Sequence, residues 1–268
     1  MNIWVSGGSS GLGLYTAMAL AQAGHTVISG ARSFSGDAPL NNLHRLHLDV
    51  TDDDSVRAFA ESALGIAPTV DAVVHCAGII CLGPCEETTP DEYRSILETN
   101  FLGMVRMNQA ALPHMRRQGN GRIIMFSSIN GLLGIPFQSA YTASKHAVEG
   151  YAECLQQELQ GFGIQVCLVE PGDHRGGAGV YRRHAADMTE TSPYAQDFVQ
   201  GVKVIRHDEE NGSDPLKLGR RIVRLLQRRR MPFRLRIASP DQHLAAILHG
   251  LLPGSIMNRI LRFYYLRR

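Results

Sequence analysis

The stretch Ser6-Gly7-Gly8-Ser9-Ser10-Gly11-Leu12-Gly13 directly follows the apolar run Asn2-Ile3-Trp4-Val5 and leads into a segment of helical period. A glycine turn between a strand and a helix is the context in which such a pattern indicates nucleotide binding. Glycines let the backbone approach a pyrophosphate, and the helix N-terminus supplies amide donors and a positive dipole. The stretch therefore predicts a dinucleotide cradle. The alternative is a plain strand-to-helix turn.

Short apolar runs alternate with helix-period segments along the chain, which is typical of βαβ units on a parallel sheet. Several runs are apolar without alternation, as expected for strands covered on both faces. The sequence predicts an α/β fold: a single doubly wound Rossmann-type domain with parallel strands, helices on both faces and C-terminal amphipathic helices. Strands are expected at residues 2–6, 26–30, 44–48, 71–75, 121–127 and 164–169, with a seventh near 233–238.

The chain divides into three expected parts. Residues 1–240 form the dinucleotide-binding and catalytic domain, and 241–268 form a helical extension of it. Within the first part, residues 173–215 are polar, rich in Gly, Arg and His, and poorly periodic, which favours a loop over the active site. Gly65 is expected to end a helix that begins after Thr51, and the second crossover helix is expected to be stunted.

The end of the second strand indicates which cofactor is bound. An acid there binds the ribose 2′-hydroxyl of NAD, whereas an arginine accommodates the 2′-phosphate of NADP. Ser29-Gly30-Ala31-Arg32-Ser33 holds one arginine and no acid, so we expect NADP(H). Arg32 could instead be a solvated loop cation. Asp49, followed by Val50, lies just beyond the third strand, where its carboxylate either accepts from the adenine amino group or caps the next helix.

Two side chains one helical turn apart indicate the chemistry. Tyr141 and Lys145 share a helix face, and Ser128 lies thirteen residues before the tyrosine, at the end of a predicted strand. The ammonium is expected to lower the pKa of the phenol from about 10 toward neutrality. Such a phenol can exchange a proton with a carbonyl oxygen while a cofactor carries the hydride. The pattern predicts ketone–alcohol redox chemistry.

These motifs resemble those of the short-chain dehydrogenase/reductase family over roughly residues 2–240. The resemblance implies that Tyr141 is the acid/base, Ser128 positions the substrate carbonyl, Lys145 holds the nicotinamide ribose, and Asn100 anchors a proton-relaying water. It also implies a set of cofactor-binding residues: Gly7, Ser9, Ser10, Gly11, Leu12, Gly13, Arg32, Asp49, Val50, Ala77, Gly78, Tyr141, Lys145, Pro171 and Gly172.

Two segments depart from the family pattern. The family's Asn-Asn-Ala-Gly segment reads His75-Cys76-Ala77-Gly78 here, which removes two amide side chains from the cofactor crevice. Pro171-Gly172 is followed by Asp173-His174-Arg175, without the threonine that helps to fix the nicotinamide carboxamide in the family. His174 could line the substrate pocket or be a solvated loop residue.

Composition excludes several other classes of protein. Five cysteines without a C-x-x-C pair fit a reduced protein, and Cys76, Cys81 and Cys85 lack the paired spacing of a zinc site, so no metal is expected. The N-terminus begins directly with strand-like residues rather than a cationic leader, and no apolar stretch reaches the roughly 20 residues of a membrane span. We therefore expect a cytoplasmic protein.

The net charge of +2 conceals an uneven distribution of charge along the chain. Residues 216–268 hold thirteen of the 27 Lys and Arg but one of the 25 acids, Asp241. In residues 255–268, Ile256, Ile260 and Tyr264 fall opposite Arg259 and Arg262. Two interpretations stay open: a basic amphipathic helix that makes peripheral contact with an anionic membrane, or a helix packed across the substrate cleft. No aromatic platform or nucleic-acid motif accompanies the charge, so no nucleic acid is expected.

The Leu251-Leu252-Pro253 turn and the tail around it resemble hydroxysteroid and retinol dehydrogenases of the family. The resemblance implies a small lipophilic alcohol or ketone, such as a steroid or lipid, and a homodimer or homotetramer. The hypothesis is an NADP(H)-dependent oxidoreductase that interconverts a secondary alcohol and a ketone. The alternatives are a non-catalytic NADP(H)-binding sensor or scaffold and a reductase of a polar metabolite.

Overall fold

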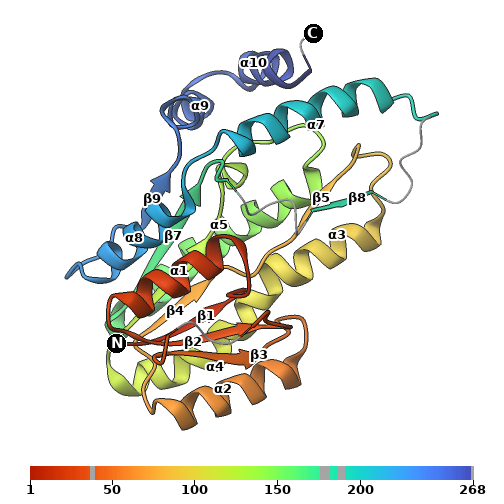
Figure 1. Ribbon diagram of the computed structural model, residues 1–268. Helices are drawn as coiled ribbons and strands as arrows, with labels where there is room; N and C mark the ends of the chain where they lie inside the picture. The colour runs from red at the N-terminus through yellow and green to blue at the C-terminus, as the bar shows by residue number, and fades with distance from the viewer. Residues whose placement is uncertain (37–39, 176–181, 186–190, 267–268) are drawn as a thin grey trace.

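A seven-stranded, wholly parallel sheet forms the centre of the computed structural model, which describes residues 1–36, 40–175, 182–185 and 191–266 (Figure 1). Its strand order is β3-β2-β1-β4-β6-β7-β9. The strands are β1 (Asn2–Ser6), β2 (Thr26–Ala31), β3 (Leu43–His47), β4 (Ala72–His75), β6 (Gly121–Phe126), β7 (Ile164–Pro171) and β9 (Arg234–Ile237). The predicted fold class is confirmed, and each expected strand is found within about two residues of its predicted ends.

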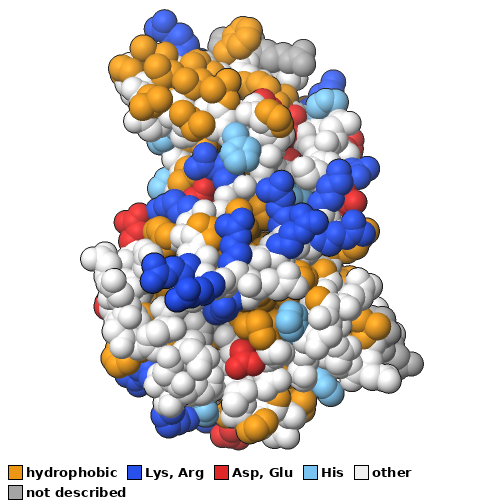
Figure 2. Space-filling model, turned by 90° about the vertical axis from the view of Figure 1, so that its left-hand side faces the viewer, with side chains coloured by type: hydrophobic (Ala, Val, Ile, Leu, Met, Phe, Trp, Pro, Cys, Tyr) orange, Lys and Arg blue, Asp and Glu red, His pale blue; other side chains and the backbone are white. Residues whose placement is uncertain are grey.

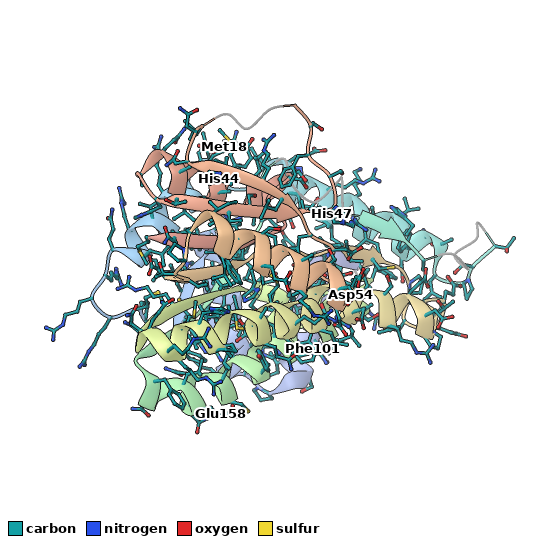
Figure 3. All side chains as sticks on the ribbon, turned by 90° about the horizontal axis from the view of Figure 1, so that it is seen from below. Met18, His44, His47, Asp54, Phe101 and Glu158 are labelled. Carbon is teal, nitrogen blue, oxygen red and sulfur yellow. The ribbon has the colours of Figure 1, made fainter. Side chains whose placement is uncertain are left out.

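Helices cover both faces of this sheet. α1 (Gly11–Gln22) and α8 (Pro215–Leu226) lie on one face, while α2 (Asp53–Ile66), α4 (Gly103–Gln118) and α5 (Ser139–Leu159) lie on the other (Figure 1). Seen from below, Met18 of α1 and Glu158 of α5 lie on opposite sides of the molecule (Figure 3). The two layers explain why the strands are apolar without alternation.

The first strand shows this two-sided burial residue by residue. Ile3 and Val5 enter the core beneath α1 and α8, whereas Trp4 enters the core beneath α2 and α4. The Trp4 ring meets Phe59 of α2 edge-on, with 5.6 Å between ring centroids. Fully burying side chains of this size contributes roughly 2–3 kcal/mol each. The strand that leads into the glycine turn is therefore held firmly from both faces.

The helix starts follow local sequence signals. Thr89 caps α3 (Pro90–Leu97) in a capping box with Glu92, and α3 continues into a π-helical turn, η1 (Glu98–Leu102), and then α4. Short 3-10 turns follow β6 and α5, namely η2 (Ile129–Gly131) and η3 (Gln160–Phe162). The expectation that Gly65 ends a helix is wrong, because α2 continues to Ile66 and stops where Ala67 turns extended.

Residues 173–215 are more ordered than their sequence suggested. They include β8 (Arg182–His184), which pairs with β5 (Ile80–Leu82), and α7 (Ala195–Glu210). Phe198, Val202 and Ile205 are buried along one face of α7, at helical spacing. The interpretation of this whole segment as a loop is therefore wrong for α7. The apolar residues of α7 are few and stand among polar ones, so the sequence shows only a weak helical period.

Two helices end the described chain, α9 (Pro240–Leu251) and α10 (Gly254–Leu266), and both lie beyond α7 at one end of the molecule (Figure 1). Met257 and Tyr265 of α10 are buried, and Tyr265 packs in the cluster that contains Phe198 and Ile205. α9 buries none of its residues fully. Among the described residues, no helix has the length and apolar character required to cross a bilayer.

A group of ion pairs fastens the last strand of the sheet. Glu170 of β7 is fully buried, and its two carboxylate oxygens accept from Arg234 at 2.9 Å and Arg236 at 3.0 Å, both on β9. Arg234 also pairs with Glu149 of α5, which is buried, and with Glu153, which is 55% exposed, at 2.7 Å. These pairs join β9, β7 and α5 just behind Pro171, where β7 enters the site.

Candidate active site

The turn between β1 and α1 brings backbone atoms unusually close together. Gly7 has φ +75°, a conformation that favours glycine, and a Cβ there would lie 2.5 Å from the amide nitrogen of Ala77. A Cβ on Gly13 would lie 2.1 Å from the carbonyl oxygen of Gly7. Both contacts are far inside van der Waals distance, so any side chain at these positions would push the turn apart.

The start of α1 presents amide groups without a capping side chain. Ser10 occupies the N-cap with an extended backbone, but its hydroxyl makes no capping hydrogen bond. The first helical amides are therefore open to an anion. A single cavity runs along this turn and is lined there by Gly7, Ser9, Ser10, Gly11, Leu12 and Gly13. The open amides and the crowded glycines fit the pyrophosphate of a dinucleotide.

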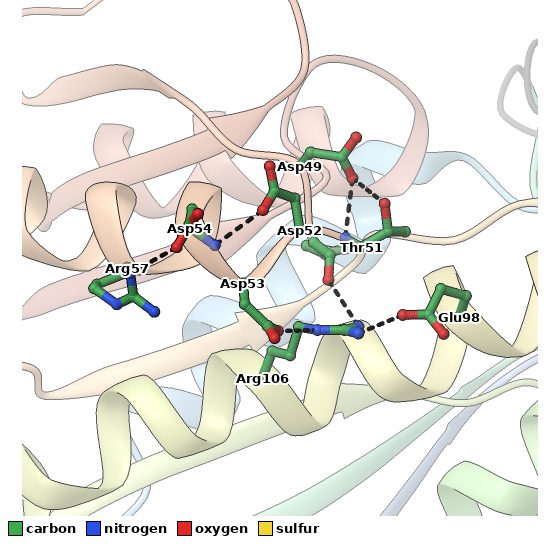
Figure 4. A network of polar contacts seen from close by, with 9 residues as sticks. Asp49, Thr51, Asp52, Asp53, Asp54, Arg57, Glu98 and Arg106 are labelled. Atoms are coloured by element: carbon green, nitrogen blue, oxygen red, sulfur yellow. Dashed lines mark hydrogen bonds and ion pairs between the residues drawn. The ribbon is translucent and has the colours of Figure 1, made fainter.

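Arg32 and Asp49 lie at the next part of the same cavity, with Val50 between the sheet and α4. Arg32 is exposed at the end of β2. Oδ1 of Asp49 accepts from the amide of Thr51 at 2.9 Å and from its hydroxyl at 2.8 Å (Figure 4). Burial alone would raise the pKa of Asp49, but these hydrogen bonds and the charge of Arg32 lower it overall. The Asp49 carboxylate is thus ionised, and one of its oxygens already binds the turn at Thr51.

The neighbouring turn is anchored by an ion-pair network that does not enter the cavity. Arg106 of α4 pairs with Asp53 at 2.5 Å and with Glu98, and it donates to the carbonyl oxygen of Val50 at 3.4 Å (Figure 4). Asp52 caps α2 by accepting from the amide of Asp54 at 2.9 Å. α2 and α4 are therefore tied together next to Asp49 and Val50, which line the cavity.

The residues of the segment His75-Cys76-Ala77-Gly78 lie in two different environments. His75 is fully buried, hydrogen-bonded to Asn108 at 2.8 Å, and burial lowers its pKa to about 4, so the ring is neutral. Cys76, Ala77 and Gly78 line the cavity. Burial raises the pKa of the Cys76 thiol, which keeps it protonated. A small uncharged thiol thus takes the place of an amide beside the glycine turn.

Ser128, Tyr141 and Lys145 meet on the far side of this cavity, which all three line. Ser128 follows β6 and caps η2, with its hydroxyl accepting from the amide of Asn130 at 3.2 Å. Lys145 is buried, donates to the carbonyl oxygen of Phe126 at 2.8 Å, and lies over the Tyr141 ring at 5.4 Å from its centroid. The helix spacing and the strand end therefore bring the predicted trio together.

The pKa of Tyr141 moves in the direction opposite to that expected. Burial raises it to about 12, and the negative charges of Asp173 and Glu209 act in the same direction, while hydrogen bonding with Ser128 opposes them. The Lys145 ammonium lies 5.4 Å from the centroid of the Tyr141 ring, and burial lowers its own pKa to about 8. The expectation of a phenol poised near neutrality is wrong for this structure. The Tyr141 hydroxyl therefore keeps its proton at neutral pH.

Asn100 lies in the π-helical turn, fully buried, and its side chain is occupied by the backbone beyond β4. Its Oδ1 accepts from the amide of Ile79 at 2.8 Å, and its Nδ2 donates to the carbonyl oxygen of Ile79 at 2.9 Å and to the hydroxyl of Ser144 at 3.0 Å. Asn100 therefore joins η1, α5 and the segment after Gly78. It shapes the cavity wall from behind.

Pro171 and Gly172 line the cavity where β7 ends, and Asp173 and His174 follow in place of the family's threonine. Asp173 accepts from the side chain of Gln242, whose own oxygen accepts from the Asp173 amide at 3.2 Å. Burial and the carboxylates of Asp208 and Glu209 raise the pKa of Asp173 to about 7. An acid that titrates near neutrality thus lies beside the predicted catalytic residues.

The substrate end of the cavity contains residues that sequence reasoning missed. α7 and α10 contribute Ile205, Asp208, Glu209 and Tyr265, while Ile80 and Ile135 supply further apolar surface. The helical spacing of Phe198, Val202 and Ile205 could have revealed α7, and Asp208 and Glu209 follow about one turn later. The contribution of Tyr265 has no local signal, because α10 reaches the cavity from the end of the chain.

Three comparisons with known proteins agree on one family. A family model described as short chain dehydrogenase matches residues 1–183. The chain is 38% identical to 3-ketodihydrosphingosine reductase of Bacteroides thetaiotaomicron, over 98% of this chain and 97% of the relative. It is also 38% identical to 17-beta-hydroxysteroid dehydrogenase type 1 of Homo sapiens, over 63% of this chain and 56% of the relative. A solved short-chain dehydrogenase from Streptomyces avermitilis has a TM-score of 0.82 at 31% identity, covering 98% of this chain and 97% of that one.

The geometry and the comparisons lead to the same conclusion. A crowded glycine turn and an uncapped helix start line one part of the cavity, and Ser128, Tyr141 and Lys145 line another. The match to 3-ketodihydrosphingosine reductase of Bacteroides thetaiotaomicron spans nearly the whole chain. This protein is therefore an oxidoreductase of the short-chain dehydrogenase/reductase family.

Proposed function

We propose that the protein is an NADP(H)-dependent reductase of a ketone on a lipophilic small molecule, and that Tyr141 supplies the proton. The observation that carries the proposal is the placement of Ser128, Tyr141 and Lys145 around the cavity that begins at the glycine turn. A dinucleotide with a nicotinamide ring, once bound, supplies the hydride. The remaining steps belong to this chain's own residues.

Each residue has a defined task in the reduction. Ser128 orients the substrate carbonyl by donating to its oxygen, and Tyr141 passes its hydroxyl proton to that oxygen as the carbonyl carbon is reduced. The raised pKa of Tyr141 keeps the proton on the phenol at neutral pH until it is needed. Lys145, held by the carbonyl oxygen of Phe126, supplies a positive charge that stabilises the phenolate left behind. Asn100 positions the wall against which these groups lie.

A lipophilic substrate is supported by the walls of the cavity. Ile80, Ile135, Ile205 and Tyr265 line the substrate end, beside the apolar cluster that α7 and α10 form. The names of two relatives, 3-ketodihydrosphingosine reductase and 17-beta-hydroxysteroid dehydrogenase type 1, also refer to lipid ketones or alcohols. A short polar metabolite would leave these apolar side chains facing water.

Replacing Arg32 by Ala should change cofactor preference. Arg32 is exposed at the cavity edge, where it can pair with a 2′-phosphate, and the end of β2 carries no acid for a free 2′-hydroxyl. We expect Arg32→Ala to weaken NADPH binding by about 10-fold or more, the usual scale of a charge-assisted hydrogen bond, and to leave NADH binding nearly unchanged. Fluorescence titration with each cofactor measures both affinities.

Arg57 provides the matched control for this experiment. It is exposed on α2, pairs with Asp54 at 2.6 Å and does not line the cavity. Arg57→Ala removes the same charge without touching the cofactor site, so NADPH affinity should stay within about twofold. Equal loss of NADPH and NADH affinity in Arg32→Ala, or a wild-type preference for NADH, would overturn the assignment of NADP(H).

Two alternatives make different predictions. A non-catalytic sensor or scaffold would bind NADPH but reduce no member of a panel of steroid, retinoid and long-chain ketones. A reductase of a polar metabolite would act on short sugar-like or acid ketones and ignore that panel. The intact Ser128, Tyr141 and Lys145 arrangement favours catalysis, because cofactor binding alone does not require a buried phenol at the cavity end.

We also propose that α9 and α10 make peripheral contact with an anionic membrane. Figure 2 shows hydrophobic side chains gathered at one end of the molecule, over these helices, with Lys and Arg below them. The exposed apolar residues are Leu244, Ile247, Leu251, Ile256, Ile260 and Phe263. The exposed basic residues of α8 and the turn after it are Lys217, Arg220, Arg221, Arg224, Arg228, Arg229 and Arg230. Apolar and basic side chains together match the surface of an anionic bilayer.

The packing and exposure of α10 support both interpretations of the last helix. Tyr265 of α10 is buried and lines the cavity, whereas Phe263 is 69% exposed and Arg259 and Arg262 lie in solvent. The helix thus packs across the substrate end with one face and presents apolar residues with the other. A lipophilic ketone could pass from a membrane to the cavity along this helix.

Removing two of the largest exposed apolar side chains should greatly weaken membrane contact. We expect the double variant Leu251→Ser and Phe263→Ser to lose most co-sedimentation with vesicles of mixed phosphatidylserine and phosphatidylcholine. Both side chains are mostly exposed, at 75% and 69%, so the fold should tolerate the change. Phe162→Ser, an exposed aromatic on η3, serves as control and should still bind.

Two outcomes would contradict the membrane proposal. The first is wild-type protein that binds neither neutral nor anionic vesicles. The second is a double variant that binds vesicles normally but no longer self-associates in sedimentation velocity, which would assign the apolar surface to a second copy of the chain. Assembly as a homodimer or homotetramer remains our expectation, through the helices that begin near Thr89 and Ser139.

A further inference from the structure

Two buried amide side chains beside the predicted catalytic trio have no task in the reduction described so far. Asn130 of η2 is 4% exposed, and Gln138, the residue directly before α5, is 7% exposed. Both line the cavity together with Ser128 and Tyr141. Because a buried amide is costly unless its polar groups find partners, the partners of each group indicate what the amide does.

Asn130 uses every polar group of its side chain. Its backbone amide donates to the Ser128 hydroxyl at 3.2 Å, and its Oδ1 accepts from that hydroxyl at 3.3 Å. Its Nδ2 donates to Oε1 of Gln138 at 2.9 Å and to the hydroxyl of Thr142 at 3.3 Å. Asn130 therefore joins Ser128, at the end of β6, to the first turn of the helix that carries Tyr141.

Gln138 has donors to spare. Asn130 presents its N–H groups to Gln138, so the atom of Gln138 that faces it is the amide oxygen. Among the residues that the structure describes, none accepts a hydrogen bond from Nε2 of Gln138. Leaving a donor unpaired on so buried a residue costs roughly 1–3 kcal/mol. Since Gln138 lines the cavity, an acceptor on a bound ligand would remove this cost.

The position of Gln138 indicates which ligand atom accepts. Gln138 precedes Tyr141 by three residues, so the two side chains share one face of the helix start, and Asn130 ties Gln138 to Ser128. Tyr141 and Ser128 are the residues to which the proposed function assigns the carbonyl oxygen. That oxygen is the acceptor that every ketone brings. As the hydride arrives it becomes an alkoxide with three lone pairs, which leaves room for a third donor.

We propose that Gln138 is a third hydrogen-bond donor to the reacting oxygen and that Asn130 orients it for this task. The inference rests on the proposed function and adds to it a catalytic residue, Gln138, and a positioning residue, Asn130. Gln138 keeps its own protons: the oxygen still receives its proton from Tyr141, and the carbon its hydride from the cofactor. Because the hydrogen bond strengthens as negative charge builds on the oxygen, the amide lowers the barrier more than it tightens substrate binding.

Gln138→Met tests the donor directly, with NADPH and a long-chain methyl ketone as substrates. The only polar atom of that ketone is the reacting oxygen, so no other substrate contact can account for the result. Methionine keeps the length of glutamine but has no N–H group. We expect kcat to fall by about 10- to 100-fold, at or below the effect of one oxyanion donor, and KM to change less than about threefold. NADPH affinity, measured by fluorescence titration on the same preparation, should match that of the wild type.

Gln118→Met is the matched control. Gln118 ends α4, and its amide bonds to the backbone nitrogen and oxygen of Val70 at 2.9 and 3.0 Å, outside the cavity. The variant removes the same amide and two real hydrogen bonds, so it measures the general cost of the change. Its kcat should equal that of the wild type.

Asn130→Asp tests the positioning residue. Aspartate keeps the oxygen that faces Ser128 but turns a carboxylate oxygen toward Gln138, so the Gln138 amide must rotate and its N–H groups leave the cavity. We expect a loss of kcat similar to that of Gln138→Met. In the double variant of Asn130→Asp and Gln138→Met the loss should be no greater than about that of either single variant, because both remove the same interaction.

The outcomes separate this inference from the function on which it rests. Wild-type kcat in Gln138→Met, or a loss of NADPH affinity in that variant, overturns the donor but leaves the reductase. Losses that multiply in the double variant overturn the positioning role of Asn130. If the wild type reduces no ketone, the proposed function fails, and isothermal titration with a medium-chain carboxylate, whose charged oxygen imitates the alkoxide, then decides. Equal affinity of wild type and Gln138→Met for that carboxylate, or no binding by either, would overturn the donor as well.

Discussion

Tyr141→Phe is expected to lower kcat for ketone reduction by at least about 10³-fold, since it removes the proton donor and leaves the aromatic ring in place. The ring of Tyr141 still packs beneath Lys145, so the helix and the cavity wall should keep their shape. NADPH affinity should change by less than about threefold, because neither the glycine turn nor Arg32 contacts the phenolic hydroxyl. Steady-state kinetics and a fluorescence titration on the same preparation measure the two quantities.

Tyr151→Phe is the control for this experiment. Tyr151 is on the same helix, α5, but its hydroxyl accepts from Asn108 at 3.3 Å and does not line the cavity. The same chemical change there should leave kcat within about threefold. Tyr141→Phe with kcat near that of the wild type would show that another group donates the proton. A parallel loss of NADPH affinity would show that the substitution disturbs the cavity as a whole.

Arg234→Met is expected to lower the free energy of unfolding by about 2–4 kcal/mol, which is a large effect for one side chain. Methionine keeps most of the aliphatic volume, but Glu149 and Glu170 lose the guanidinium that holds them. Glu170 is fully buried and would retain Arg236 alone among the pairs described. Because Arg234 is itself 33% exposed, the loss falls below that of a wholly buried pair. Urea denaturation with linear extrapolation measures it.

Glu153→Gln provides the comparison, since it removes only the outermost partner of Arg234. Glu153 is 55% exposed, and an exposed pair of this kind contributes about 0–1 kcal/mol. If both variants lose the same small amount of stability, the ion pairs between β9, β7 and α5 contribute little to the free energy of unfolding. If Arg234→Met loses much more stability than Glu153→Gln, then adding Glu170→Gln to Arg234→Met should restore part of the loss. The added change removes the buried negative charge of Glu170 that Arg234 no longer balances.

Much of the fold follows from short-range patterns. The apolar runs, the glycine turn and the capping box at Thr89 each specify a local conformation, and the seven strands lie where those patterns place them. The layer order then follows, because a strand that is apolar on both faces must be covered on both. The same reasoning failed at Gly65, where α2 continues to Ile66, and at α7, where burial of one face outweighs weak local propensity.

The sequence alone determined the family, the glycine turn and the meeting of Tyr141 with Lys145, because residues four apart on a helix share a face whatever surrounds them. The tertiary structure decided the electrostatics and the substrate end. The pKa of Tyr141 rises because of burial and because of the negative charges of Asp173 and Glu209, and the substrate end of the cavity forms only where the end of β7, α7 and α10 meet. Such effects depend on distances between segments far apart in the chain, which no local pattern of residues encodes.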